Sequence, residues 1–262
     1  SHWGFSGSYM ALFSFSSLAT NKKNKILKKF KIEIFADGAD IKSIKELNRF
    51  KFIKGFTTNP SLMKIAGVKN YKIFAQNVLK IIKKKPVSFE VFSDDIDEME
   101  KQAKEISSWG KNAYVKIPIT NTKGQKTLKL IKKLNNIGIK CNVTAILTID
   151  QVEDVYKSIK KNNKVIISIF AGRIADTGRS PIPIMKKAIK ICKNKRNIKI
   201  LWASTREALS LYQAEKIGTH IITVPYSILS KIKFYKKNLK KFSLDTVKTF
   251  YNDAKKAGYK IN

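Results

Sequence analysis

Short apolar runs alternate along this chain with longer segments of helical periodicity, from about residue 31 to the end. Each apolar run predicts a strand, and these strands are expected at 32–36, 53–57, 87–92, 113–117, 139–144, 164–170, 198–204 and 220–224. The segments between them carry Lys and Glu on one face, and they predict helices at 40–49, 61–83, 95–108, 124–137, 149–160, 182–193, 206–217 and 226–240. A closing amphipathic helix is expected near 244–257. Eight strand–helix units predict an α/β fold, a single-domain (β/α)₈ TIM barrel with an extra C-terminal helix.

The first 30 residues differ from the rest of the chain. The segment 1–9 resembles an expression remnant ahead of Met10, and the segment 11–20 is short, Ser-rich and apolar. No basic region precedes it, so a secretory signal fits poorly, whereas a Ser-rich, acid-poor transit peptide stays open. We expect a tag remnant or leader outside the fold at 1–30, and a catalytic barrel at 31–262 that no Pro/Gly/Ser-rich linker divides.

Composition excludes several classes of protein. The sequence contains no apolar run of about 18 residues, so no membrane span is predicted. Cys141 and Cys192 lack metal-ligand spacing, which argues against a metal site or a disulfide framework and fits the reducing cytoplasm. Of the two histidines, His2 lies in the N-terminal extension, so a Ser-His-Asp or Cys-His site would depend on His220 alone. We expect no cofactor and no metal.

The net charge of +34 could indicate a lysine-rich protein that binds nucleic acid or another polyanion. The lysines, however, are spread over nearly every predicted helix, and the aromatic residues lie mainly in apolar strands. Arginine, the residue best suited to planar recognition of phosphate, occurs only at Arg49, Arg173, Arg179, Arg196 and Arg206. Specific nucleic-acid binding is therefore not expected, and polyanion binding remains the alternative from another functional class.

One lysine lies within the predicted strand 113–117. Strand alternation places Ala113, Val115 and Ile117 on one face and Tyr114 and Lys116 on the other. In a sheet covered by helices, that arrangement puts the lysine inside, near the carboxyl end of its strand. A lysine that loses hydration has a lowered pKa, and its neutral amine can attack a carbonyl. The ordinary alternative is a solvated surface lysine.

Polar residues recur at the carboxyl ends of the predicted strands, where barrel enzymes hold their active sites. They are Asp37, Thr57, Asn59, Glu90, Lys116, Asn142, Thr144, Ser168, Ser204 and Arg206. Each has a structural alternative: Asp37 could cap a helix, Asn59 could form a turn, and Thr144 or Ser168 could be a satisfied core hydroxyl. Because so many coincide at strand ends, a single pocket is the better interpretation.

Strand parity supports that pocket. Asn142 and Thr144 share one face of their strand, and the apolar Val143, Ile167 and Ile169 take the opposite parity, toward the helices. Ser204 and Arg206 likewise share one parity.

Four segments together resemble a known family. They read GFTTNPSL at 55–62, VKIP at 115–118, NVT at 142–144 and GRIAD at 172–176. These segments are similar to the signatures of class I transaldolases and the related fructose-6-phosphate aldolases, and the resemblance runs from about residue 32 to the C-terminus. It implies a (β/α)₈ barrel whose Schiff-base lysine lies on the fourth strand, where Lys116 falls.

The resemblance also implies a role for each residue. Lys116 would form an iminium with a ketose, Asp37 would take the proton of the C4 hydroxyl, and Glu90 and Thr144 would hold a water that shuttles protons. The substrate-binding residues would be Thr57, Asn59, Asn142, Ser168 and Phe170. The phosphate-binding residues would be Arg173, Ser204 and Arg206, since arginine suits a phosphate dianion.

Two positions separate the branches of this family. Transaldolases are similar to this chain in carrying Glu at the position of Glu90 and Phe at the position of Phe170. The fructose-6-phosphate aldolases carry Gln and Tyr at these two positions. The resemblance therefore implies transfer of a dihydroxyacetone unit from sedoheptulose 7-phosphate or fructose 6-phosphate to an aldose phosphate, in the pentose phosphate pathway, with a possible homo-oligomer. The segment 36–40, Trp202 and Thr205 depart from the usual pattern. An aldolase or a specialised sugar transaldolase thus stays open.

Overall fold

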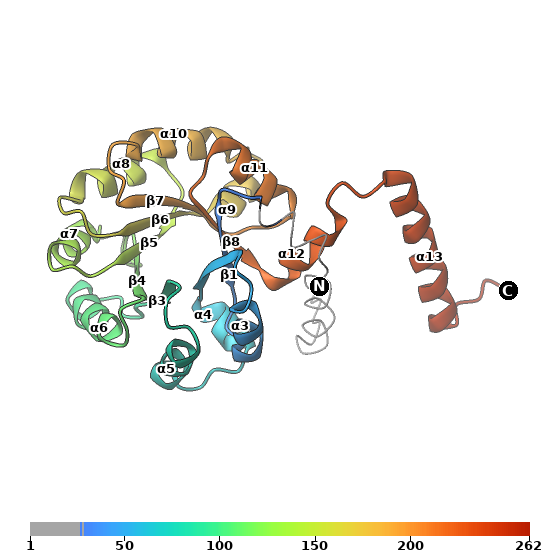
Figure 1. The fold of residues 1–262 in the computed structure, drawn as a ribbon, viewed down its shortest axis with the longest axis horizontal. Coiled ribbons are helices and arrows are strands. Elements are labelled where there is room, and N and C mark those ends of the chain that lie inside the picture. Colours follow the sequence, from blue (N-terminus) through green and yellow to red (C-terminus); the bar gives the residue numbers. More distant parts are fainter. Residues whose placement is uncertain (1–26, 28) are drawn as a thin grey trace.

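The computed structural model describes residue 27 and residues 29–262, so the interpretation of 1–30 as a tag or leader falls largely outside the described residues. Eight parallel strands close into a barrel in the order of the sequence, with helices around it (Figure 1). The strands are β1 (Glu33–Asp37), β2 (Ile53–Thr57), β3 (Val87–Glu90), β4 (Ala113–Pro118), β5 (Cys141–Ile146), β6 (Val165–Ile169), β7 (Ile198–Trp202) and β8 (Ile221–Pro225). The predicted (β/α)₈ barrel is confirmed.

Several of the helices begin directly after a residue whose side chain caps them. Asn59, Asn70, Asp95 and Thr148 each accept a backbone N–H three residues further on, which satisfies one free donor of the first helical turn. The helices are α3 (Ile41–Leu47), α4 (Pro60–Ile65), α5 (Tyr71–Ile81), α6 (Ile96–Ser108), α7 (Leu128–Asn136), α8 (Ile149–Ser158), α9 (Ala171–Asp176), α10 (Ile182–Cys192), α11 (Leu209–Ile217), α12 (Tyr226–Leu229), the 3₁₀ helix η1 (Ser230–Phe234) and α13 (Leu239–Ala257). None of the described helices could cross a membrane.

Strand alternation divides the core into two parts. Ala113, Val115 and Ile117 of β4 belong to the large cluster between the sheet and the helices. Tyr114 belongs to a smaller cluster inside the barrel, whose other members are Phe35, Ile166, Leu201, Ala203 and Ile221. The predicted orientation of β4 is confirmed, and the side chain of Lys116 lies on the inner face.

Several predicted boundaries are wrong by two residues or more, and three of these differences change the description of an element or of the site. The predicted helix 61–83 is two helices, because Gly67 takes a left-handed φ of 74° after α4 and Asn70 then starts α5. The predicted helix 226–240 is broken near Lys236, whose φ is 52°, and α13 begins only at Leu239. Strand β7 ends at Trp202, two residues earlier than expected, so Ser204 and Arg206 lie in a loop and their shared strand parity does not apply.

Candidate active site

A cavity of about 440 Å³ opens at the carboxyl ends of the strands. It is lined by all twelve residues that the sequence singled out: Asp37, Thr57, Asn59, Glu90, Lys116, Asn142, Thr144, Ser168, Phe170, Arg173, Ser204 and Arg206. A cavity of this size is typical of small-molecule sites. The structure therefore brings the predicted residues together in one cavity.

Lys116 lines this cavity from strand β4. Its side chain is buried, and its Nζ donates a hydrogen bond of 2.9 Å to the carbonyl oxygen of Thr58. Strand register places Glu90 of β3 and Asn142 of β5 directly beside it. The surface-lysine alternative is therefore wrong, because this amine is held inside the barrel by a single backbone acceptor with polar neighbours on both sides.

Two carboxyl groups share the cavity with Lys116. Burial raises the pKa of Asp37 above its ordinary value, although the nearby Lys116 charge and a hydrogen bond from Thr57 oppose the shift. That bond runs from Thr57 Oγ1 to Asp37 Oδ1 at 2.9 Å. Burial also raises the pKa of Glu90, with the Lys116 charge again opposing it. A carboxylate with a raised pKa holds a proton more readily, which suits general acid–base work.

Neutral polar groups line the wall beside β5. Asn142 donates to Ser88 Oγ at 3.1 Å and accepts from Ser168 Oγ at 2.6 Å, so its amide orientation is fixed from both sides. The Thr144 hydroxyl is buried and has no hydrogen-bond partner among the described residues. Ala145 follows with a φ of 62°, where the register of β5 against β6 shifts. An unpaired buried hydroxyl costs stability, so its place beside the cavity points to a ligand or a water as its partner.

The structure decides between a helix-capping role and a place in the cavity for Asp37 and Asn59. Asp37 does not cap the first helix; Asp40 occupies the N-cap position of α3, and Asp37 faces the cavity. Asn59 does cap α4, because its Oδ1 accepts the backbone N–H of Leu62 at 2.8 Å. That bond leaves the amide nitrogen of Asn59 available toward the cavity, so the structural role and a substrate contact are compatible.

The arginine side of the cavity depends on a close contact between α9 and the loop after β7. A Cβ at Gly172 would lie 1.5 Å from the carbonyl oxygen of Ser204, so only glycine allows this approach. Ser204 itself has a left-handed φ of 59°. Arg206 donates to Asp176 Oδ2 of α9 at 2.9 Å, which holds the guanidinium beside the cavity. The contact thus brings Arg173 and Arg206 to one wall.

The sequence of this chain is similar to the sequences of known proteins. Residues 34–262 match the sequence profile of the family described as "Transaldolase/Fructose-6-phosphate aldolase". The chain belongs to this family. A protein named "Probable transaldolase" from Thermoanaerobacter sp. (strain X514) is 33% identical over 88% of this chain and 100% of its own length. A protein of the same name from Nitrosopumilus maritimus is 36% identical over 77% of this chain and 87% of its own length.

Several contacts around the cavity of this transaldolase/aldolase family member could not be predicted from the sequence. The Thr58 carbonyl that holds Lys116 is a backbone atom, which no side-chain pattern reveals. Thr223 of β8 lies against the Thr57 hydroxyl, and Thr205 donates to the Thr223 carbonyl at 2.8 Å. Asp176 was part of the GRIAD signature, but its pairing with Arg206 depends on the fold. Strand parity could have found Thr223, which follows Ile221 on the inner face.

No group of three or more His, Cys, Asp or Glu side chains within the described residues could hold a metal ion. Cys141 and Cys192 are both buried as free thiols, and burial raises the pKa of Cys141 to about 12. A thiol with so high a pKa is a poor nucleophile at neutral pH. Among the groups that line the cavity, the amine of Lys116 is the best candidate for covalent chemistry.

Proposed function

We propose that this chain is a transaldolase that moves a dihydroxyacetone unit from a ketose phosphate, such as sedoheptulose 7-phosphate or fructose 6-phosphate, to an aldose phosphate. The observation that carries the proposal is Lys116, a buried amine inside the barrel whose cavity also holds Asp37 and Glu90. An amine with two carboxyl groups of raised pKa nearby has the parts that Schiff-base chemistry needs. Membership of the family supports an enzyme of this kind.

The first half of the reaction follows from these groups. Lys116 Nζ attacks the C2 carbonyl of the donor, and the carbinolamine loses water to give an iminium. Glu90 lies beside Lys116 in register, and with the unpaired hydroxyl of Thr144 it holds the water that carries protons in this step. Asp37 then takes the proton of the C4 hydroxyl. The C3–C4 bond breaks, its electron pair moves into the iminium, and an aldose phosphate leaves.

The second half reverses these steps with another aldehyde. The enamine carbon attacks the acceptor carbonyl, Asp37 returns its proton to the new hydroxyl, and water releases the ketose from Lys116. Asn142 and Ser168 are fixed by their mutual hydrogen bond and hold the hydroxyls of the retained three-carbon unit. Thr57 and Asn59 complete this subsite. Phe170 offers no proton to the enamine, which favours transfer over release.

The phosphate subsite consists of Arg173, Ser204 and Arg206, because two permanent cations converge on one wall of the cavity. Transfer between sugar phosphates is the chemistry of the pentose phosphate pathway, and we assign the chain to that pathway in the cytoplasm. We also propose that the catalytic unit is 31–262. Of the described residues before it, Leu27 is buried in the core cluster and Phe30 packs against Tyr212, so the folded unit includes both.

Borohydride trapping with fructose 6-phosphate tests the central assignment. Reduction of the iminium should add the three-carbon unit or the sugar to Lys116 irreversibly, which peptide mass mapping detects. Lys116→Ala should lose both turnover and label. Lys129→Ala is the control, since Lys129 is exposed on α7 and lines neither end of the barrel, and it should keep both. A label on another lysine with Lys116 intact would contradict the assignment.

An aldolase is the second candidate, because it shares the lysine, the base and the bond cleavage. The two activities differ in the fate of the enamine: an aldolase protonates it and releases free dihydroxyacetone. Glu90 and Phe170 favour transfer, so the protein should release almost no dihydroxyacetone from fructose 6-phosphate without an acceptor. A coupled reductase assay measures this, and substantial release would favour the aldolase. No turnover of any sugar phosphate would leave polyanion binding as the better hypothesis.

We further propose that the chain forms a homo-oligomer through α13. This helix extends away from the barrel (Figure 1), and none of its residues is buried. Its apolar side chains follow a helical stripe of Leu244, Val247, Phe250 and Tyr251, each more than half exposed. An exposed apolar stripe of this kind marks an interaction surface. A second copy of the chain is the proposed partner, because it is present wherever the protein is.

A further inference from the structure

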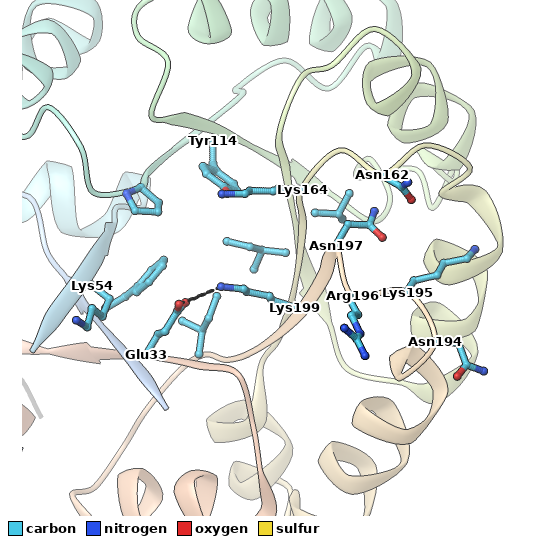
Figure 2. A pocket seen from close by; sticks show the side chains of 15 residues that line it. Glu33, Lys54, Tyr114, Asn162, Lys164, Asn194, Lys195, Arg196, Asn197 and Lys199 are labelled. Atoms are coloured by element: carbon cyan, nitrogen blue, oxygen red, sulfur yellow. Dashed lines mark hydrogen bonds and ion pairs between the residues drawn. The ribbon is translucent and has the colours of Figure 1, made fainter. Parts of the chain in front are cut away.

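A second cavity lies at the opposite end of the barrel from Lys116. Its volume is about 810 Å³, larger than the cavity at the carboxyl ends. Its lining comes from the amino-terminal ends of strands β1, β2, β4, β6, β7 and β8 and from the loops that precede them. Figure 2 shows cationic side chains from several of these elements around its opening. The reaction proposed above uses none of the groups that line this cavity.

Positively charged side chains outnumber negatively charged ones in the lining of this cavity. Its lining includes one carboxylate, Glu33, which is bound by the Nζ of Lys199 at 3.0 and 3.1 Å. The cationic residues of the lining are Lys54, Lys164, Lys195, Arg196 and Lys199. Like charges confined to a concave surface repel one another, and low-dielectric walls strengthen their field. An anion that enters this cavity therefore meets a strong positive potential.

Three of these cations are free to bind a ligand. Lys195 donates to the carbonyl oxygens of Tyr156 and Ile159, at 2.6 and 2.8 Å, so its position is structural. Lys54, Lys164 and Arg196, by contrast, are exposed and make no hydrogen bond or ion pair with any described residue. They come from three separate elements: β2, the loop before β6 and the loop before β7.

The floor of the cavity adds a neutral donor. Tyr114 is only 5% exposed, yet its hydroxyl has no hydrogen-bond partner among the described residues and lines the cavity. Burial raises the pKa of Tyr114 to about 12, so the hydroxyl keeps its proton and can donate. Asn162 and Asn194 also line the cavity, on the same loops as Lys164 and Arg196 (Figure 2). These groups match an acceptor-rich ligand.

We propose that this cavity is a second binding site, for a small molecule that carries at least two phosphate groups. Three unpaired cations on separate elements suit several negative charges better than one. The volume suits a molecule the size of a metabolite. The cationic side chains surround one pocket and do not form a stripe along a surface. The lining of the cavity also has no row of aromatic side chains on which successive bases could stack, so a small ligand fits better than nucleic acid.

The site is close enough to the active site to affect it. Phe35 and Tyr114 form the floor here, and two residues later on the same strands lie Asp37 and Lys116. Two residues of a strand span roughly 7 Å. The small apolar cluster inside the barrel separates the two cavities, since some of its side chains line one cavity and the others line the second.

Isothermal titration with inorganic pyrophosphate at fixed ionic strength tests the proposal. Because pyrophosphate could also enter the active site, the titrations use the variant Arg173→Gln/Arg206→Gln, in which that phosphate subsite is disabled. One equivalent should still bind. Adding Lys164→Gln/Arg196→Gln should weaken this binding at least about tenfold, because each charge-assisted hydrogen bond contributes roughly that factor. Circular dichroism checks that each variant is folded.

A matched control removes two cations elsewhere. Lys129 and Lys132 are exposed on α7 and do not line the cavity, so Lys129→Gln/Lys132→Gln should leave pyrophosphate binding unchanged. Equal weakening by both pairs would show general charge attraction and overturn the proposal, as would no binding once the active-site arginines are gone. A 20-nucleotide RNA that displaces pyrophosphate and binds more tightly would assign the cavity to nucleic acid instead. A failure of borohydride trapping would leave this test unaffected.

Discussion

Asp37 shows how a single side chain can serve function at the expense of stability. Its carboxyl group is placed where burial disfavours the charge, and neither Lys116 nor the hydrogen bond from Thr57 fully compensates, since the pKa remains raised. A catalytic base gains from this arrangement because it holds a proton more readily. The folded chain loses stability at any pH where the group is ionised.

Asp37→Asn should therefore stabilise the fold in a pH-dependent way. A raised folded-state pKa costs stability above that pKa, and the cost vanishes below about pH 4, where the unfolded carboxyl is also protonated. The variant should unfold at higher urea concentration than the parent at pH 8, with little gain at pH 4, and should lose turnover. Asp253→Asn, at an exposed position on α13, is the control and should show no such trend. Lower stability of Asp37→Asn at pH 8 would contradict the argument.

The arginines of the cavity give a second prediction at this scale. Arg206→Ala and Arg173→Ala should each raise KM for fructose 6-phosphate by roughly 10- to 100-fold, because a charge-assisted hydrogen bond contributes about 1.5–3 kcal/mol. Turnover of a donor without phosphate should change little. Arg49→Ala is the control, since Arg49 is exposed and lines neither this cavity nor the one at the other end of the barrel. Equal losses with both kinds of donor would place the phosphate elsewhere.

Much of the candidate site could be predicted from the sequence because many of its residues lie at or near strand ends. There, the position of a residue along its strand determines which face of the sheet its side chain occupies. Lys116, Asn142 and Ser168 follow from alternation alone. The Thr58 carbonyl and the pairing of Asp176 with Arg206 could not be found in this way. Both depend on where separate elements meet, which no local pattern encodes.

At the scale of elements, the short helix α9 was not predicted, although its sequence was recognised. Six residues are too few for a periodic signal, and the helix is held by its contact with the loop after β7. The split between α4 and α5 was missed for a related reason: Gly67 is a weak signal inside an otherwise helical pattern. Long, strongly amphipathic helices such as α6 were predicted to within about a residue.

Gly172→Ala tests the contact that holds α9. An added methyl group would overlap the Ser204 carbonyl, so the helix or the loop must move. We expect a loss of about 1–3 kcal/mol in unfolding free energy and a raised KM for phosphorylated donors, since Arg206 depends on this contact. Gly67→Ala is the comparison: it has open space around it but a left-handed backbone, so it should cost about 1–2 kcal/mol without affecting KM. An unchanged KM in Gly172→Ala would contradict the role of the contact.

At the scale of the whole molecule, the chain is a closed barrel with one element left outside it. The barrel buries its apolar residues in two clusters, whereas α13 buries none (Figure 1). The break at Lys236 directs α13 away from the barrel, and the helix keeps an apolar stripe that the rest of the described chain does not cover. Periodicity predicted the helix correctly, but it could not predict that the stripe faces away from the core.

Self-association through α13 gives the last prediction. Val247 and Phe250 are 61% and 70% exposed, and burying both against another copy would remove a large apolar area from water. Val247→Asp/Phe250→Asp places two charges in that interface and should convert the oligomer to monomers in light scattering coupled to size-exclusion chromatography. Thr249→Asp/Asn252→Asp adds the same charges to the opposite face of the helix and should leave the oligomer intact. Because α13 buries nothing in its own barrel, the monomeric variant should stay folded, and a monomeric parent protein would refute the proposed interface.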